Sequence, residues 1–426
     1  MERDVGIEVY LTTTRGFGGR IKVNPEDFVV SEIPILPPRE EDGRYTAAWI
    51  KTRNWETNRL VRMMSRELRI SRKRISFAGT KDKRALTSQL FQFDAPIDLV
   101  GGLRIKDVEL LDFYQTSKKV EIGDLRGNRF DIIIRDIRLS GEETAKLATA
   151  TAAELAAAGG FPNFFGVQRF GSIRPITHIV GRHIVRGGFK AAVDAYVANP
   201  IEGEDEQAFE VRTALEQSGD YGEALKTYPD VMSFEKAILN HLVKHPDDHI
   251  GALEQLPFNL LMMFVHGYQS YLFNRILSER IKRRMPLSMP TVGDVVMAVG
   301  KDGLPDDRHF VPVTGDNIEK VGRQTSGGKA FVTGVLFGSE STLAAGEMGE
   351  IEKGVVESEG LRPHDFTLPA MPRLSSKGTR RPLAMPLPRM DVKPSDGSVE
   401  TKFELSKGCY ATILLREFMK VDPLKG

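Results

Sequence analysis

The chain has 426 residues and a formal net charge of +1, with 41% hydrophobic and 27% charged residues. That length exceeds one ordinary hydrophobic core, so we expect a soluble globular protein of two or three domains. No apolar run approaches the roughly 18 residues of a membrane helix. The first ten residues include Glu2, Arg3, Asp4 and Glu8, which argues against a signal peptide. We therefore expect a cytoplasmic protein with no membrane partner.

The first 160 residues mix strand-like and helix-like patterns, which is typical of an α+β domain. Residues 54–68 carry an apolar stripe of helical period, with Asn54 or Thr57 as the candidate cap. Residues 142–158 predict an alanine-rich helix that the Gly159-Gly160 pair ends. Strands are predicted at 20–32 (broken by a turn at Pro25), 75–77, 85–93 and 120–134.

The character of the chain changes after residue 160. Residues 161–260 look mostly helical and acidic, and residues 290–350 are glycine-rich with a strand-like run at 329–337. The proline-dense segment 363–394 predicts an extended connector. Beyond it the tail predicts a strand at 401–406 and a helix at 410–420, so the chain returns to regular structure.

The near-zero net charge hides two oppositely charged segments. Residues 51–84 hold twelve Lys and Arg against three acidic residues, and residues 201–257 hold thirteen acidic residues against four basic ones. A basic stripe is typical of a phosphate-binding face, although a charge run alone also fits a solvated helix surface. We expect the basic segment to contact nucleic acid and the acidic segment to face away from it.

Cysteine and histidine offer little chemistry. Cys409 is the only cysteine, which excludes a disulfide within the chain and any multi-cysteine zinc site. His245 and His249 are four residues apart, but Pro246 between them breaks a helix there. We expect no metal.

The segment from Phe77 to Thr87 carries the strongest chemical signal. It places Asp82 on a glycine-led turn together with Lys81, Lys83 and Arg84. Nearby cations favour the charged form of a carboxylate, and the same cations can hold phosphates. This combination suits nucleophilic or general-base work on a polyanion. The structural alternative is a turn aspartate that bonds to its own backbone.

Several motifs in this order resemble the TruD family of tRNA pseudouridine synthases, and the resemblance spans most of the chain. Each motif alone is weak, but their shared order makes coincidence very improbable. The length and the large middle region resemble an archaeal or eukaryotic-type member. The motifs are residues 25–32, 77–87, 126–130, 163–171, 269–274 and 408–412.

The resemblance implies a V-shaped protein with two domains. The catalytic domain, residues 1–160 plus 371–426, is expected to be a mixed sheet flanked by helices, as in other pseudouridine synthases. A family-specific α/β insertion domain is expected at residues 161–370. The resemblance also implies that tRNA is the partner, that the target is commonly uridine 13 of the D arm, and that no cofactor takes part. We expect a monomer.

The resemblance assigns roles to single residues. Asp82 matches the catalytic aspartate, which either attacks the nucleotide covalently or removes a proton from the sugar. Lys22 matches a basic residue that pairs with it, although it could be an exposed strand lysine. Asn128 and Phe130 match residues that read and stack the flipped base, against the alternatives of a turn residue and a core residue.

The remaining candidates lie around these residues. Phe28 and Glu32 share one face of a strand; Phe28 could pack or touch substrate, and Glu32 could order a Lys or Arg side chain. We expect Lys81, Lys83 and Arg84 to contact phosphates. Arg169 is expected to contact RNA, while the aromatic residues around it favour a packed hinge.

Two other classes remain open. A non-catalytic RNA-binding protein could keep the basic face, but an aspartate within such a surface costs affinity unless it does chemistry. A metal-dependent nuclease needs clustered carboxylates for Mg²⁺, whereas Asp82 has cations around it. Activity unaffected by EDTA distinguishes a synthase from that nuclease. A methyltransferase is a still weaker candidate, because no glycine loop follows an early strand in the way that a bound adenosyl group would require.

Overall fold

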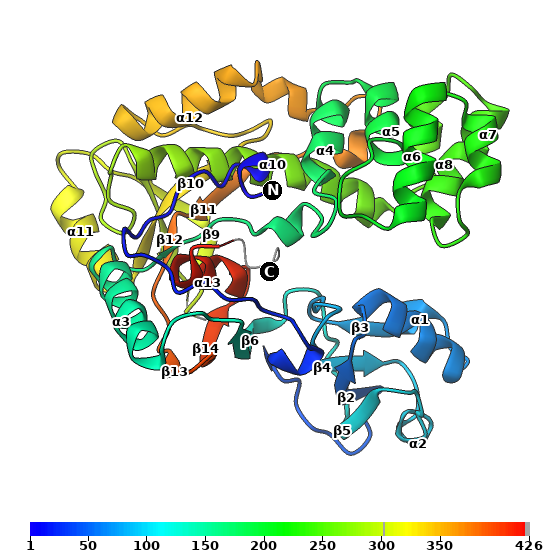
Figure 1. The fold of residues 1–426 in the computed structure, drawn as a ribbon, viewed down its shortest axis with the longest axis horizontal. Coiled ribbons are helices and arrows are strands. Elements are labelled where there is room, and N and C mark those ends of the chain that lie inside the picture. Colours follow the sequence, from blue (N-terminus) through cyan, green and yellow to red (C-terminus); the bar gives the residue numbers. More distant parts are fainter. Residues whose placement is uncertain (301–302, 422–426) are drawn as a thin grey trace. The chain divides into compact units, whose positions relative to one another are not determined.

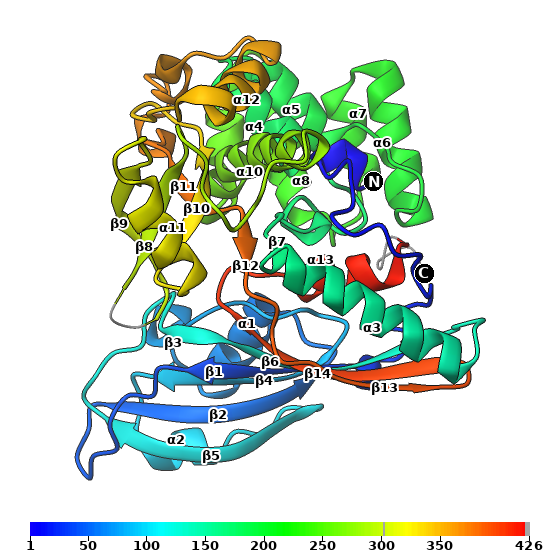
Figure 2. The same ribbon diagram turned by 90° about the vertical axis from the view of Figure 1, so that its left-hand side faces the viewer.

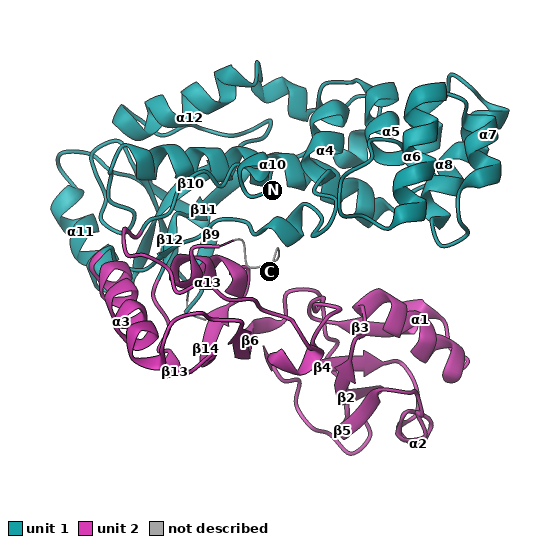
Figure 3. Cartoon of the chain, viewed as in Figure 1, with its two compact units in different colours: residues 1–11, 158–385 teal, residues 12–157, 386–426 magenta. Residues whose placement is uncertain are grey.

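The computed structural model describes residues 1–300 and 303–421. The chain forms two compact units (Figures 1 and 3). We call residues 12–157, together with the chain from residue 386 onward, the sheet unit, and residues 1–11 with 158–385 the helical unit. Compared with the predicted division, residues 1–11, 158–160 and 371–385 are grouped with the helical unit.

The sheet unit is built on one mixed sheet. In the described chain its strand order is β13-β14-β6-β1-β4-β2-β5, with β3 paired to β4. β1 runs parallel to β4 and antiparallel to β6, so it lies in the middle of the sheet. The strands are β1 (Phe28–Pro34), β2 (Tyr45–Arg53), β3 (Ile75–Phe77), β4 (Leu86–Phe93), β5 (Val108–Thr116), β6 (Leu125–Arg135), β13 (Asp391–Ser395) and β14 (Ser398–Ser406).

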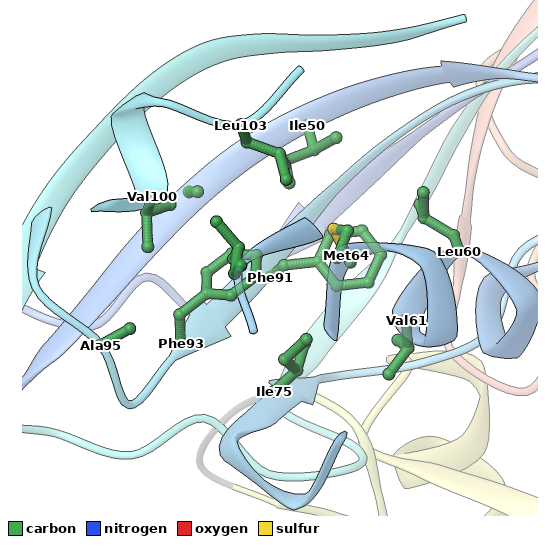
Figure 4. Packing of buried hydrophobic residues seen from close by; sticks show 12 residues of the cluster. Ile50, Leu60, Val61, Met64, Ile75, Phe91, Phe93, Ala95, Val100 and Leu103 are labelled. Atoms are coloured by element: carbon green, nitrogen blue, oxygen red, sulfur yellow. The ribbon is translucent and has the colours of Figure 1, made fainter. Parts of the chain in front are cut away.

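Helices pack on this sheet through apolar faces. Helix α1 (Thr57–Glu67) inserts Leu60 and Met64 against Ile50 and Phe91 of the sheet (Figure 4). Its N-cap is Glu56, whose carboxylate accepts from two helix N–H groups, so the expected caps Asn54 and Thr57 are wrong. The unit also holds α2 (Ile97–Gly101), α3 (Gly141–Ala157) and α13 (Ala411–Met419). In Figure 2, α3 runs along β13.

The tail completes this sheet. β14 pairs with β6 along its whole length, so that Phe403 lies opposite Phe130. The predicted connector over 363–394 is wrong in part: this segment contains short helical turns and strands that pair with other strands. Proline fits there because the 3-10 turns η5 (Pro363–Phe366) and η6 (Pro372–Leu374) begin with it.

The helical unit contains a helical array and a smaller sheet (Figure 1). Helix α10 (Phe258–Lys282) packs against α4, α12 and β10, and most of its faces are buried. The small sheet has the order β11-β10-β8-β9 within the described residues. Its strands are β8 (Val295–Val299), β9 (Pro305–Pro312), β10 (Ala330–Leu336) and β11 (Thr379–Pro382), and β7 (Phe161–Pro162) pairs with β12 (Ala384–Met385).

The remaining helices of this unit lie partly in the predicted helical region, residues 161–260, and partly beyond it. They are α4 (Thr177–Val185), α5 (Phe189–Val197), α6 (Glu206–Ser218), α7 (Tyr221–Thr227), α8 (Ser233–Lys244), α9 (His249–Glu254), α11 (Ile318–Ser326) and α12 (Gly346–Ser358). Within the described ranges, no helix combines the length and the apolar character needed to cross a membrane.

Candidate active site

Asp82 lies on the turn between β3 and β4, and hydrogen bonds from three directions fix this turn. The Lys81 N–H donates to the Thr57 hydroxyl at 2.9 Å. The Gln89 amide donates to the Gly79 carbonyl at 3.0 Å, and the Gly123 N–H donates to the Ala78 carbonyl at 2.8 Å. The turn is therefore held against the start of α1, against β4 and against the loop before β6.

The Asp82 carboxylate pairs with Lys22. Its Oδ1 lies 3.2 Å from the Lys22 Nζ, and the Asp82 side chain keeps 36% of its exposure whereas that of Lys22 keeps 13%. The same ammonium lies 4.2 Å from the centroid of the Phe28 ring. Lys22 has a φ of 57°, a left-handed backbone conformation uncommon for a residue with a side chain. The structure thus brings these three predicted residues together, with the carboxylate open to solvent.

Lys81 and Glu32 form a second pair directly behind the turn. Their Nζ and Oε2 atoms are 2.5 Å apart, and the two side chains are 4% and 0% exposed. The other Glu32 oxygen accepts from the Leu90 N–H at 3.3 Å. Glu32 thus orders a lysine side chain, which is one of the roles expected for it. The Lys81 ammonium points into the protein and away from solvent.

Three aromatic rings form a row on the same face of the sheet. Phe28 and Phe130 meet edge to face at 6.1 Å between centroids, and Phe130 stacks on Phe403 at 5.4 Å. Phe28 and Phe130 are 1% and 7% exposed, so both rings are mostly packed. The sequence analysis missed Phe403. The signal that could have pointed to it is the alternation of residue types along β14, in which Val399, Phe403 and Leu405 share one face.

Asn128 lies opposite Glu32 in the β1–β6 pairing, on the face that also carries Phe130. Its side-chain Oδ1 is buried and has no hydrogen-bond partner among the described residues. A buried amide oxygen without a partner is costly in a folded protein. Asn128 therefore has an unused acceptor beside the aromatic row.

Lys83 and Arg84 differ from their neighbour Lys81 in exposure. Both side chains lie on the surface. Arg84 donates to the Val23 carbonyl at 3.2 Å, next to Lys22, and this bond ties the Asp82 turn to the segment before β1. These two cations are placed to meet an anion from solvent.

Arg169 belongs to the helical unit, where it ends the 3-10 turn η4 (Val167–Arg169). Its Nε is buried without a hydrogen-bond partner in the described part of the chain. The pKa of His266 is lowered by burial first and by the charge of Arg169 second, so the two side chains are close.

The aromatic residues around Arg169 are packed, as expected for this motif. The Asn274 side chain bonds both the N–H and the C=O of Phe165, and the Phe165 ring lies edge to face with Phe273. The motifs at 163–171 and 269–274 therefore pack on each other.

The described residues contain no group of three or more His, Cys, Asp or Glu placed to hold a metal ion. The chemistry that the Asp82 site offers is that of a solvent-accessible carboxylate beside an ammonium, with an aromatic row and a free amide oxygen nearby. Such a carboxylate can act as a nucleophile or as a base.

Comparison with known proteins places this chain and its fold in one family. The family model for "tRNA pseudouridine synthase D (TruD)" matches residues 4–418. A protein of Methanosarcina mazei is 43% identical over all of this chain and 98% of its own length, and one of Methanococcoides burtonii is 43% identical with the same coverage. Both carry the name "Probable tRNA pseudouridine synthase D".

A crystal structure of a TruD protein from Methanosarcina mazei superposes with a TM-score of 0.84 at 42% identity, covering 100% of this chain and 98% of that one. The chain therefore belongs to the TruD family of tRNA pseudouridine synthases. It is an isomerase of the pseudouridine synthase class, and the predicted family and α+β fold are confirmed.

Proposed function

We propose that this protein converts a uridine of tRNA, in the D arm and commonly at position 13, to pseudouridine with Asp82 as the catalytic residue. The observation that carries the proposal is the Lys22–Asp82 pair. It leaves the Asp82 carboxylate open to solvent on an otherwise anchored turn. Family membership supports the reaction class.

The reaction is an isomerisation, so its atoms balance within the nucleotide. The bond from ribose C1′ to uracil N1 breaks, the base turns, and C1′ joins to C5. The C5 proton is lost and N1 gains one. Asp82 either attacks the nucleotide covalently and is released when C1′ joins C5, or takes a proton from the sugar and returns it when that bond has formed. Lys22 pairs with the carboxylate in both routes. The chemistry needs no redox or nucleotide cofactor.

The target base has to leave its stack to reach Asp82. The aromatic row of Phe28, Phe130 and Phe403 forms an apolar floor beside the carboxylate. The unused Oδ1 of Asn128 is suited to accept from the uracil N3–H once the base is flipped. Because both Phe28 and Phe130 are mostly packed, they offer the base an edge of the row rather than a whole open face.

The other predicted residues divide into two groups. Lys81 and Glu32 position the Asp82 turn from behind, because their pair is buried. Lys83 and Arg84 meet phosphates from the solvent side, and Arg169 contacts RNA from the helical unit. The protein acts as a cytoplasmic monomer without a metal, which size-exclusion chromatography and an assay in EDTA test.

The deciding experiment is an assay on unmodified tRNA transcripts. The wild-type protein and Asp82→Asn are incubated with the transcripts, and pseudouridine is mapped by chemical labelling and primer extension. We expect a new signal in the D arm with the wild type and none with Asp82→Asn. The variant should bind tRNA and unfold like the wild type.

Two results would overturn the proposal. Turnover by Asp82→Asn would remove the carboxylate from the mechanism. A wild type that binds tRNA tightly and never forms pseudouridine on any transcript would indicate an RNA-binding protein without this activity. As a control, Asp136→Asn replaces an exposed aspartate of the same unit and should keep full activity.

A further inference from the structure

The outward face of α1 carries a row of arginines. Arg59, Arg62 and Arg66 are spaced three and four residues apart, and Arg69 follows directly after the C-cap residue Leu68. All four are exposed. Residues with this spacing lie on one side of a helix, and the opposite side of α1 is the apolar face buried in the core (Figure 4). We call these four residues the arginine row.

The arginine row lacks ion pairs within the described residues. In the described chain, Arg62, Arg66 and Arg69 have no ion pair with an acidic side chain, and Arg59 lies 5.6 Å from the Trp55 ring centroid. Other surface arginines of the sheet unit do have such pairs, for example Arg39 with Asp112 and Arg44 with Asp94. Like charges three or four residues apart destabilise a helix. A row of unpaired arginines therefore favours a polyanionic ligand over a helix face that is merely solvated.

The helix that carries the arginine row begins at the Asp82 turn. Thr57 is the first residue of α1, and its hydroxyl accepts the N–H of Lys81, the neighbour of Asp82. From Arg59 to Arg66, within α1, a rise of 1.5 Å per residue gives about 10 Å. The arginine row is thus a track of positive charge on the helix whose first residue contacts the Asp82 turn.

We propose that the arginine row binds the phosphates of the RNA stem that adjoins the target uridine, and so supplies tRNA affinity without taking part in the chemistry. This inference rests on the proposed function, which places a flipped uridine at Asp82. An RNA stem fits because regularly spaced cations match regularly spaced phosphates, and Arg can grip phosphate with two donors.

A lipid surface fits the arginine row less well. A helix that lies on a membrane needs an exposed apolar face. The apolar face of α1 is buried in the protein, and Met63, at 36% exposure, is the one residue of α1 found among the exposed large hydrophobics of the described chain.

The test compares two triple variants with the same change of charge. The first, Arg62→Gln/Arg66→Gln/Arg69→Gln, neutralises the arginine row and spares Arg59, which touches Trp55. The control neutralises three exposed lysines elsewhere in the sheet unit. They are Lys146, Lys393 and Lys402, each already paired with an acidic residue.

The measurements are tRNA binding at several salt concentrations and single-turnover rates at saturating tRNA. For the arginine-row variant we expect the Kd to rise on the order of tenfold or more. We expect the slope of log K against log salt to fall by roughly 2 to 3, because each released phosphate contact contributes about 0.7 to 0.9. The single-turnover rate at saturation should stay within twofold, and the control should match the wild type in every respect.

The choice of RNA ligand in the binding assay distinguishes this inference from its alternatives. Affinity for a hairpin containing the target uridine should fall in the variant, while affinity for a single strand of the same loop sequence should change little.

An unchanged Kd and salt slope on tRNA would overturn the inference. Loss of binding to anionic vesicles, with tRNA binding kept, would overturn it in favour of a lipid surface. If the wild type binds tRNA without forming pseudouridine, the proposed function fails, yet the salt slopes still decide whether the arginine row binds RNA.

Discussion

The Lys22–Asp82 and Lys81–Glu32 pairs meet on consecutive residues of one turn, yet water reaches them very differently. In the first pair the carboxylate keeps 36% of its exposure, and in the second it keeps none. Both are lysine–carboxylate contacts, so residue type alone does not separate their roles. The comparison teaches that the exposed pair keeps a carboxylate available for chemistry, while the buried pair fixes the backbone that carries it.

The energetic consequences of the two pairs differ as well. Breaking a buried pair leaves an uncompensated charge inside the protein and costs about 3–5 kcal/mol, whereas a solvent-exposed pair contributes about 0–1 kcal/mol. A substitution in the buried pair should therefore lower both stability and activity. One in the exposed pair should lower activity and leave stability nearly unchanged.

The largest loss of stability is expected for Lys81→Met. It leaves the Glu32 carboxylate buried with the Leu90 N–H as its remaining partner. We expect the free energy of unfolding of the sheet unit to fall by about 3–5 kcal/mol, measured by urea denaturation. The rate of pseudouridine formation should fall strongly even where the variant is folded.

The neighbouring Lys83→Met is the matched control for this substitution. It removes an exposed lysine from the same turn, so unfolding should match the wild type, and any loss should appear in tRNA affinity. If Lys81→Met and Lys83→Met were equally stable, the buried pair would not anchor the turn.

The Asp27–Arg135 pair is intermediate in exposure between the two lysine pairs, because the Asp27 carboxylate is buried and the Arg135 side chain is half-exposed. Arg135 donates two hydrogen bonds to it at 2.8 and 2.6 Å. These bonds first, and the Asn24 N–H after them, hold the pKa of Asp27 below its usual 3.8. Its stabilisation is therefore fully present above pH 3.8 and is lost as the pH falls through the lowered pKa of the folded state.

We expect Asp27→Asn to destabilise the protein at neutral pH by less than Lys81→Met does. Because the variant lacks the titrating group, the difference in stability from the wild type should shrink below about pH 4. Thermal unfolding between pH 2.5 and 7 measures this, with Asp136→Asn as the exposed control. A constant difference across that range would contradict the assigned cause.

Lys22→Met tests the exposed pair. Because water reaches the Asp82 side of this contact, we expect stability to change by about 1 kcal/mol or less. The rate of the chemical step should fall, since the Asp82 carboxylate loses its neighbouring ammonium. Single-turnover assays at saturating tRNA measure that step, and Lys402→Met, which removes an exposed lysine on the other face of the sheet, should keep the wild-type rate. A stability loss as large as that of Lys81→Met would remove the distinction between the pairs.

Sequence patterns predicted the helices and strands that a local pattern of residues defines. The helix at 54–68 was predicted almost to its ends, because an apolar stripe of helical period is visible without knowledge of its partners. Strands β2 and β5 were not predicted. β2 begins Tyr-Thr-Ala-Ala and is buried on both faces near its start, so it lacks clean alternation. β5 is an edge strand whose side chains are nearly all exposed or half-buried, so it shows no buried face.

The candidate site was predictable only in part. The Lys22–Asp82 pairing followed from the family resemblance, and the two atoms do meet. Charge alone grouped Lys81 with Lys83 and Arg84 as phosphate contacts, because sequence does not show which lysine of a turn faces inward. Phe403 reaches the site from about 270 residues further along the chain than Phe130, a contact that only the pairing of β14 with β6 reveals.

A small change in stability is also expected for the double replacement Lys81→Met/Glu32→Leu. Replacing both members of a buried pair with apolar side chains of similar volume is often neutral or stabilising, so unfolding should return to within about 1 kcal/mol of the wild type. The coupling between the two sites follows from the two single variants and the double variant. The Lys81 N–H still reaches Thr57, but the side chains no longer specify one direction for the turn. We therefore expect single-turnover rates to stay low although stability recovers. If turnover recovered together with stability, the pair would serve the fold alone, and the position of Asp82 would be set by the backbone bonds to Thr57 and Gln89.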